Sequence, residues 1–128
     1  MDFKRIMHVG IMAKNTGSLC NWYIKKLGFK KVYQLPATME RSEVYWLKFE
    51  NNMIEIVPAN NNMRRNRSIK DPGISHFSIT VECFDEYLEK IIKKGIKVED
   101  IHEFKEFKCG FFNDGEGNLV EILSFTKL

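Results

Sequence analysis

The sequence predicts an α+β fold made of two tandem β-α-β-β-β modules in a single domain, residues 1–128. The segment around His8 is repeated around His76, 68 residues later, and the segment around Glu55 is repeated around Glu121, 66 residues later. Between each pair of anchors the hydrophobic pattern changes from strand to helix and back to strand in the same order. A chain of 128 residues suits one domain in which neither half alone buries a full core.

The first module covers residues 5–58. Residues 5–13 are mostly apolar and predict a buried strand. Thr16 or Ser18 is expected to cap the helix that follows, and Gly28 is expected to end it in a left-handed conformation. The apolar face of this helix consists of Leu19, Trp22, Tyr23 and Leu27. Three more strands are expected at residues 29–35, 43–49 and 53–58.

The second module covers residues 74–125 and repeats this order. A strand at 75–81 is followed by a helix that Gly95 ends. The apolar face of this helix consists of Phe84, Leu88, Ile91 and Ile92. Strands are expected at residues 96–101, 107–113 and 119–125, the last two joined by a hairpin turn. The linker, residues 59–73, is polar and ends in Asp-Pro-Gly, so we expect it to be exposed.

The composition excludes several classes of protein. A net charge of +3 is too small for a nucleic-acid-binding surface, and no stretch approaches the ~20 apolar residues of a membrane span. The three cysteines form no CxxC pattern, which argues against a disulfide framework and against a thiolate zinc site. We therefore expect a cytoplasmic protein that binds neither nucleic acid nor membranes.

His8, Glu55, His76 and Glu121 each interrupt an apolar strand. Their alternate neighbours are apolar, so these polar side chains are expected to point inward, where a carboxylate needs a partner. Taken singly, a backbone hydrogen bond explains such a histidine, and a salt bridge or an edge position explains such a glutamate. The same residues at the same step in both halves favour one shared metal site.

Two neutral imidazoles and two carboxylates balance the charge of one divalent ion. This shell of nitrogen and oxygen atoms suits nickel, zinc, cobalt, manganese or ferrous iron, and it does not select among them. Because no thiolate is included, a structural zinc site of the finger type is not expected.

The sequence resembles those of the vicinal oxygen chelate superfamily, which includes glyoxalases, bleomycin resistance proteins and extradiol dioxygenases. The resemblance covers nearly the whole chain. The matching segments are His8-Val9-Gly10-Ile11, Trp22-Tyr23, Leu27-Gly28-Phe29, Ile54-Glu55-Ile56-Val57, Ile74-Ser75-His76-Phe77, and residues 111–118 with Glu121. It implies a concave mixed sheet with the helices outside, usually in a homodimer, with the metal site built within one chain or across two subunits.

The ligand order His, Glu, His, Glu is most similar to that of glyoxalase I (lactoylglutathione lyase). The resemblance implies a metal-dependent lyase or isomerase acting on a vicinal-oxygen substrate, such as a hemithioacetal of methylglyoxal, through a metal-bound enediolate. Glu121 would be the main base, and Glu55 would return or share the proton. Met12 stands where bacterial glyoxalase I has an arginine for glutathione, so another thiol, or a role for Arg64, Arg65 and Arg67 of the linker, is an alternative.

Two other functions fit the same superfamily. One is a different metal enzyme, an epimerase or an antibiotic-modifying thiol transferase, in which the first carboxylate position usually differs from Glu55. The other is a non-catalytic drug-binding resistance protein with a cleft lined by Trp46 and Phe112. Such relatives generally lack the metal ligands, so the four candidates here argue against it.

Overall fold

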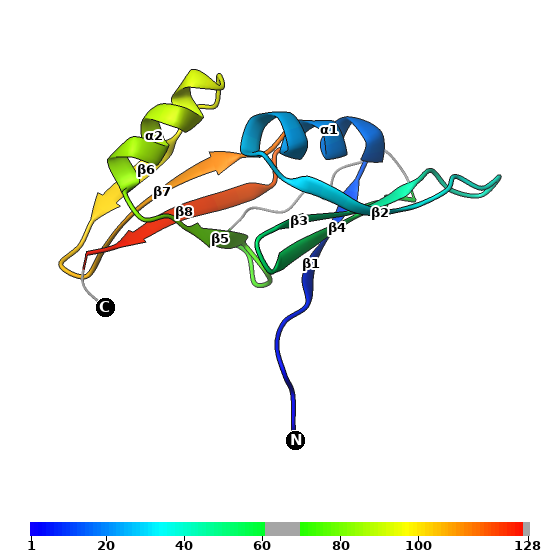
Figure 1. The fold of residues 1–128 in the computed structure, drawn as a ribbon, viewed down its shortest axis with the longest axis horizontal. Helices are drawn as coiled ribbons and strands as arrows, with labels where there is room; N and C mark the ends of the chain where they lie inside the picture. The colour runs from blue at the N-terminus through cyan, green and yellow to red at the C-terminus, as the bar shows by residue number, and fades with distance from the viewer. Residues whose placement is uncertain (61–69, 127–128) are drawn as a thin grey trace. The chain divides into compact units, whose positions relative to one another are not determined.

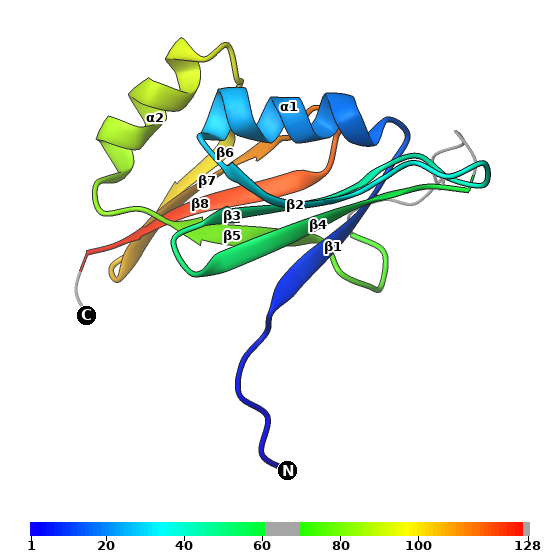
Figure 2. The same ribbon diagram turned by 45° about the vertical axis from the view of Figure 1, so that its right-hand side comes forward.

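The computed structural model describes residues 1–60 and 70–126, and the chain divides into two compact units at residues 64 and 65. Each unit has its own four-stranded sheet and one helix, in the order β-α-β-β-β (Figures 1 and 2). The predicted α+β fold of two tandem modules is therefore confirmed. No helix in the described part of the chain is long and apolar enough to cross a membrane.

The first unit has a mixed sheet in the order β1-β4-β3-β2, with β1 parallel to β4 and the other neighbours antiparallel. Its elements are β1 (His8–Ala13), α1 (Thr16–Leu27), β2 (Lys30–Leu35), β3 (Val44–Phe49) and β4 (Asn52–Pro58). Strand β1 is shorter than the predicted 5–13. Its partner β4 begins at Asn52, which lies one residue before the partner of His8, so residues 5 and 6 have no strand beside them, and residues 5–7 are exposed.

The N-cap of helix α1 lies one residue before Thr16, the earlier of the two predicted caps. The Asn15 side chain accepts a hydrogen bond of 2.9 Å from the backbone N–H of Ser18, which makes Asn15 the N-cap in place of Thr16 or Ser18. The predicted end is confirmed, because Gly28 has a left-handed backbone with φ of 74°. Leu19 and Tyr23 are buried as predicted.

The helix covers only one face of its sheet, and this fixes where the polar side chains lie. The buried sheet residues alternate along the strands and share the face on which α1 packs. They are Ile11, Ala13, Leu47, Ile54 and Ile56; Val44, at the start of β3, is also buried but does not follow this alternation. Residues at the alternate strand positions, His8 and Glu55 included, point to the opposite face.

The second unit repeats the topology, with the order β5-β8-β7-β6 and β5 parallel to β8. Its elements are β5 (His76–Thr80), α2 (Phe84–Lys93), β6 (Glu99–Glu103), β7 (Phe107–Asn113) and β8 (Leu119–Phe125). The bounds of β7 and β8 are as predicted. Strand β6 begins three residues later than expected, because the apolar Ile96 is buried before the strand rather than paired within it.

Helix α2 buries a narrower stripe than predicted. Phe84 and Ile91 are buried, but Ile92 is 54% exposed, so its place on the apolar face was wrong. Phe84, Leu88 and Ile91 are spaced i, i+4 and i+7, and Ile92 lies a further 100° or so around the helix. The helix ends at Lys93, and Gly95 beyond it has a φ of 81°, as a terminating glycine does.

Gly110 on β7 is expected to be essential for packing in the second unit. A Cβ atom there would lie 3.0 Å from Val98 Cγ1 and 3.1 Å from Phe84 Cζ. We predict that Gly110→Ala lowers the free energy of unfolding by about 1–3 kcal/mol in urea titrations. Gly10→Ala is the control, because nothing lies within 4 Å of the added atom. Equal unfolding midpoints for the two variants would contradict the prediction.

Candidate functional site

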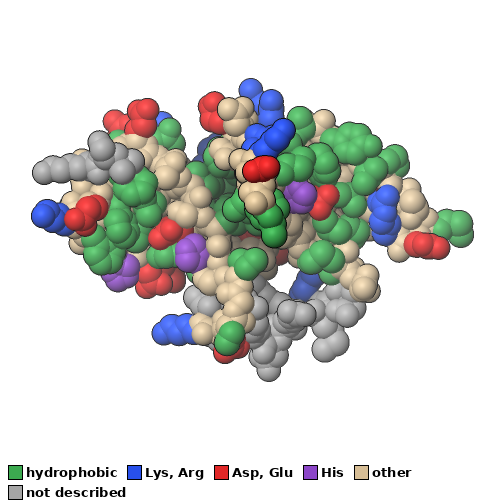
Figure 3. All heavy atoms as spheres, turned by 90° about the horizontal axis from the view of Figure 1, so that it is seen from below, with side chains coloured by type: hydrophobic (Ala, Val, Ile, Leu, Met, Phe, Trp, Pro, Cys, Tyr) green, Lys and Arg blue, Asp and Glu red, His purple; other side chains and the backbone are tan. Residues whose placement is uncertain are grey.

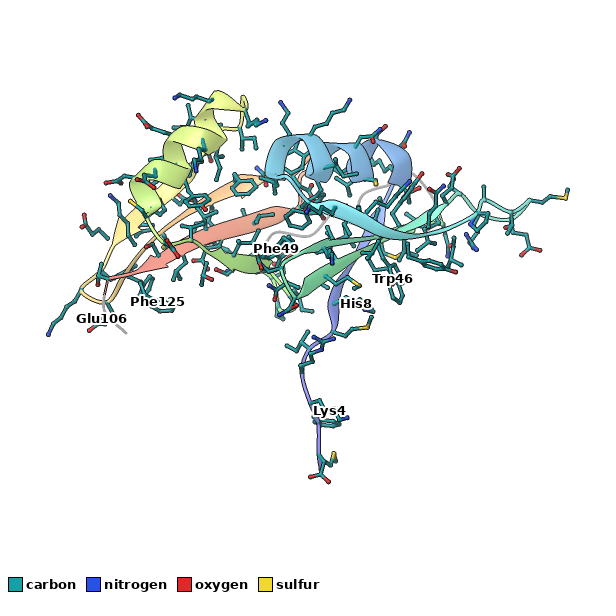
Figure 4. The ribbon with its side chains drawn as sticks, viewed as in Figure 1. Lys4, His8, Trp46, Phe49, Glu106 and Phe125 are labelled. Atoms are coloured by element: carbon teal, nitrogen blue, oxygen red, sulfur yellow. The ribbon has the colours of Figure 1, made fainter. Side chains whose placement is uncertain are left out.

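His8 and Glu55 form a pair on the open face of the first sheet. Glu55 is on β4, in register with Gly10 of β1, two residues from His8 on the same side of the strand. Nε2 of His8 lies 3.6 Å from Oε1 of Glu55, and their side chains are 32% and 24% exposed. Figure 4 shows His8 below the strands, on the side away from α1.

Trp46 lies beside both members of this pair. It is directly opposite Glu55 in the antiparallel β3–β4 ladder. Its indole Nε1–H donates a hydrogen bond of 2.7 Å to Oε2 of Glu55, and its ring centroid is 6.0 Å from that of His8 (Figure 4). The two oxygens of Glu55 therefore have different neighbours: Oε2 faces the indole and Oε1 faces the imidazole.

His76 and Glu121 form the equivalent pair in the second sheet. Nε2 of His76 lies 3.7 Å from Oε1 of Glu121. Phe111 is opposite Glu121 in the β7–β8 ladder, and its ring stands nearly perpendicular to His76 at 5.2 Å. Burial raises the pKa of the nearby Cys109 thiol, and the charge of Glu121 and a hydrogen bond to Glu121 raise it further.

The other ring nitrogens of the two histidines differ. Nδ1 of His76 is hydrogen-bonded to the Ser75 hydroxyl at 2.6 Å. Nδ1 of His8 is buried and has no hydrogen-bond partner among the described residues. Met7 precedes His8 as Ser75 precedes His76, and a thioether is only a weak acceptor and no donor, so it cannot replace the hydroxyl.

Two expectations about surroundings need correction. The face that carries His8 and Glu55 is partly exposed, and Met12 on it is 59% exposed, because the apolar core lies on the other face, under α1. Phe112 is 2% exposed and belongs to the core, so it lines no cleft. In the space-filling view of Figure 3, histidine side chains reach the surface beside acidic ones and among hydrophobic side chains.

The contact between Trp46 and Glu55 was missed from the sequence, although a signal for it exists. A two-residue turn at Glu50 and Asn51 places Phe49 opposite Asn52. Counting outward from that pair along an antiparallel hairpin places Trp46 opposite Glu55. The position of the turn therefore predicts that Trp46 lies opposite Glu55.

The geometry of each pair fits a metal ion. Separations of 3.6 and 3.7 Å exceed the ~2.7–3.2 Å of a hydrogen bond. They remain below about 4.2 Å, the most that two ligand atoms can be apart when each is about 2.1 Å from one ion. Neither unit gathers three or more His, Cys, Asp or Glu side chains around such a point in its described residues, so each pair by itself supplies two ligands.

Solved structures share the fold over nearly the full length of the chain. A glyoxalase family protein from Enterococcus faecalis is 28% identical, with a TM-score of 0.83 and coverage of 97% of this chain and 100% of that one. A lactoylglutathione lyase from Agrobacterium tumefaciens is 19% identical, with a TM-score of 0.72 and coverage of 97% and 96%. A variant of a fosfomycin resistance protein from Listeria monocytogenes, crystallised with Mn(II), is 15% identical, with a TM-score of 0.69 and coverage of 94% and 90%.

A search of curated protein sequences found no match. The family model of the Glyoxalase/Bleomycin resistance protein/Dioxygenase superfamily, in contrast, matches residues 5–122, which include both His–Glu pairs. A match over almost the whole chain, together with the two β-α-β-β-β modules, establishes the family. The chain belongs to the Glyoxalase/Bleomycin resistance protein/Dioxygenase superfamily.

Proposed function

We propose that His8, Glu55, His76 and Glu121 together bind one divalent metal ion. Each pair offers one nitrogen and one oxygen atom that face each other without a hydrogen bond between them. Two protein ligands are fewer than the three or four of a typical zinc centre, whereas two equivalent pairs complete such a shell. The site is formed either within one chain or between two subunits of a homodimer.

We further propose that the protein is a metal-dependent lyase or isomerase of the glyoxalase I type. Its substrate would carry two vicinal oxygens, as a hemithioacetal of methylglyoxal does. When bound, the ion supplies Lewis-acid chemistry to those oxygens. Glu121 takes the proton from the substrate carbon, and Glu55 returns or shares it. The observation that carries this proposal is the His–Glu pair on the same strands of both halves.

A drug-binding function is the second candidate. Tyr33 is 51% exposed and its ring lies edge-on to Trp46 at 5.8 Å, so aromatic surface adjoins the His8–Glu55 pair. Aromatic rings of this kind stack on flat apolar ligands. An epimerase or an antibiotic-modifying thiol transferase on the same scaffold is the remaining alternative.

The test is a panel of substrates offered to the protein loaded with each candidate metal. The panel contains methylglyoxal hemithioacetals of glutathione, cysteine and coenzyme A, an acyl-CoA epimer pair, and fosfomycin with each thiol. We expect isomerisation of a hemithioacetal. Met12, in place of an arginine, favours a thiol other than glutathione. The linker arginines offered as the alternative, Arg64, Arg65 and Arg67, lie outside the described residues. Drug binding by metal-free protein, without turnover of any compound, would favour the second candidate.

Ser75 is expected to strengthen metal binding through His76. A ligating histidine donates its second ring N–H to a neighbouring acceptor, which fixes the orientation and tautomer of the ring, and loss of that acceptor lowers metal affinity by about 10–100-fold. We predict a loss near tenfold for Ser75→Ala, measured by competition with a chromophoric chelator. Met7→Ala is the matched control, since Met7 occupies the same place before His8. Equal affinities in the two variants would contradict this role.

A further inference from the structure

The two glutamates differ in what holds them, although their strands are equivalent. The residue opposite Glu55 is Trp46, and the residue opposite Glu121 is Phe111. Both rings lie against the histidine of their own pair, at 6.0 and 5.2 Å. Only the indole has an N–H group to donate, so a hydrogen bond from this position exists in the first half and not in the second.

The indole is itself held in place. Tyr33 on β2 packs edge-on against Trp46 at 5.8 Å, and the hydrogen bond to Glu55 is partly buried. A donor bonded to an ionised carboxylate forms one of the stronger kinds of hydrogen bond, and shielding from water strengthens it. The bond uses Oε2 and leaves Oε1 facing Nε2 of His8 at 3.6 Å.

We infer that Trp46 is a positioning residue that fixes the Glu55 carboxylate with Oε1 toward His8, and thereby raises the metal affinity of the site. This inference rests on the proposed function. Glu121 has no indole opposite it, because its ladder partner Phe111 has no N–H group to donate. The carboxylate of Glu55 is therefore the held ligand, and that of Glu121 retains more freedom to move while it transfers a proton.

The first experiment measures Zn²⁺ affinity by chelator competition in a matched pair of variants. Trp46→Phe places opposite Glu55 the same ring that lies opposite Glu121, and Phe111→Trp makes the reverse change. We expect Trp46→Phe to lower the affinity by about 10–100-fold, the usual effect of losing a partner that orients a ligand. Trp22→Phe, which removes the other tryptophan, is expected to leave it unchanged.

The second experiment observes the hydrogen bond directly and does not depend on activity. In ¹⁵N-tryptophan-labelled Trp22→Phe protein, Trp46 gives the single indole N–H signal. Without metal, we expect this signal to be shifted downfield and slow to exchange with solvent. Glu55→Gln should move it, because the amide is a weaker acceptor than the carboxylate, and Glu121→Gln should not. Addition of Zn²⁺ should also change the chemical shift of this indole signal.

The outcomes separate this inference from the proposed function. If the wild-type protein binds Zn²⁺ and Trp46→Phe binds it equally well, the positioning role is overturned and the metal site stands. The positioning role is also overturned if the chemical shift of the indole N–H is the same in Glu55→Gln as in the protein with Glu55. If the wild-type protein binds none of the candidate metals, both the proposed function and the role of Trp46 in metal binding are overturned.

Discussion

Replacement of Glu121 by glutamine is expected to lower kcat by about 10²–10⁴-fold, the usual contribution of a general base, while the fold remains intact. The amide has nearly the shape of the carboxylate but cannot take a proton from a substrate carbon. The surroundings of Glu121 tolerate the change. Its neighbours are the rings of Phe111 and His76 and the Cys109 thiol, and the amide takes up nearly the same space among them.

The matched comparison is Glu55→Gln, because both side chains lie on equivalent strands beside equivalent histidines. We expect Glu55→Gln to weaken metal binding more than Glu121→Gln does, since Glu55 is the carboxylate that the indole of Trp46 holds. Glu106→Gln, in the exposed turn between β6 and β7, serves as the neutral control (Figure 4). Full activity of Glu121→Gln, or loss of kcat only in Glu55→Gln, would contradict the assignment of the base.

Most of the fold could be predicted from the sequence because strand and helix periods are local properties. The bounds of β7 and β8 agree with the prediction, since polar turn residues flank both strands. Strand β1 was predicted too long, because the end of a strand depends on where its partner ends, and that partner lies more than 40 residues further along the chain. Asn15 was missed as a cap because several neighbouring residues are equally good N-caps.

The candidate site could be predicted only in part. The repeat identified both His–Glu pairs, and the structure brings the two members of each pair within 4 Å. The sequence repeat did not predict that the face carrying these pairs is partly exposed, since a strand pattern cannot show which side of the sheet the helix covers. The hydrogen bond from Trp46 depends on the rotamers of two side chains, and a strand pattern fixes faces rather than rotamers.

Replacement of either site histidine by alanine is expected to remove the same metal ion. If the four side chains form one centre, wild-type protein binds about one ion per chain. His8→Ala and His76→Ala should then each lower affinity by more than the ~100-fold that loss of an outer partner costs. The double variant should be little worse than either single variant, because residues that act as one unit are not additive.

Two independent two-ligand sites would give a different pattern, and this makes the comparison decisive. His8→Ala would then leave the ion at the His76–Glu121 pair in place, each single variant would lose part of the metal, and the losses would add in the double variant. His102→Ala controls for loss of any histidine, because His102 is exposed on β6 beside Phe104. Plasma mass spectrometry of untagged protein gives the stoichiometry. Additive losses would rule out a single shared centre, and identical losses would establish that both halves of the repeat hold one ion.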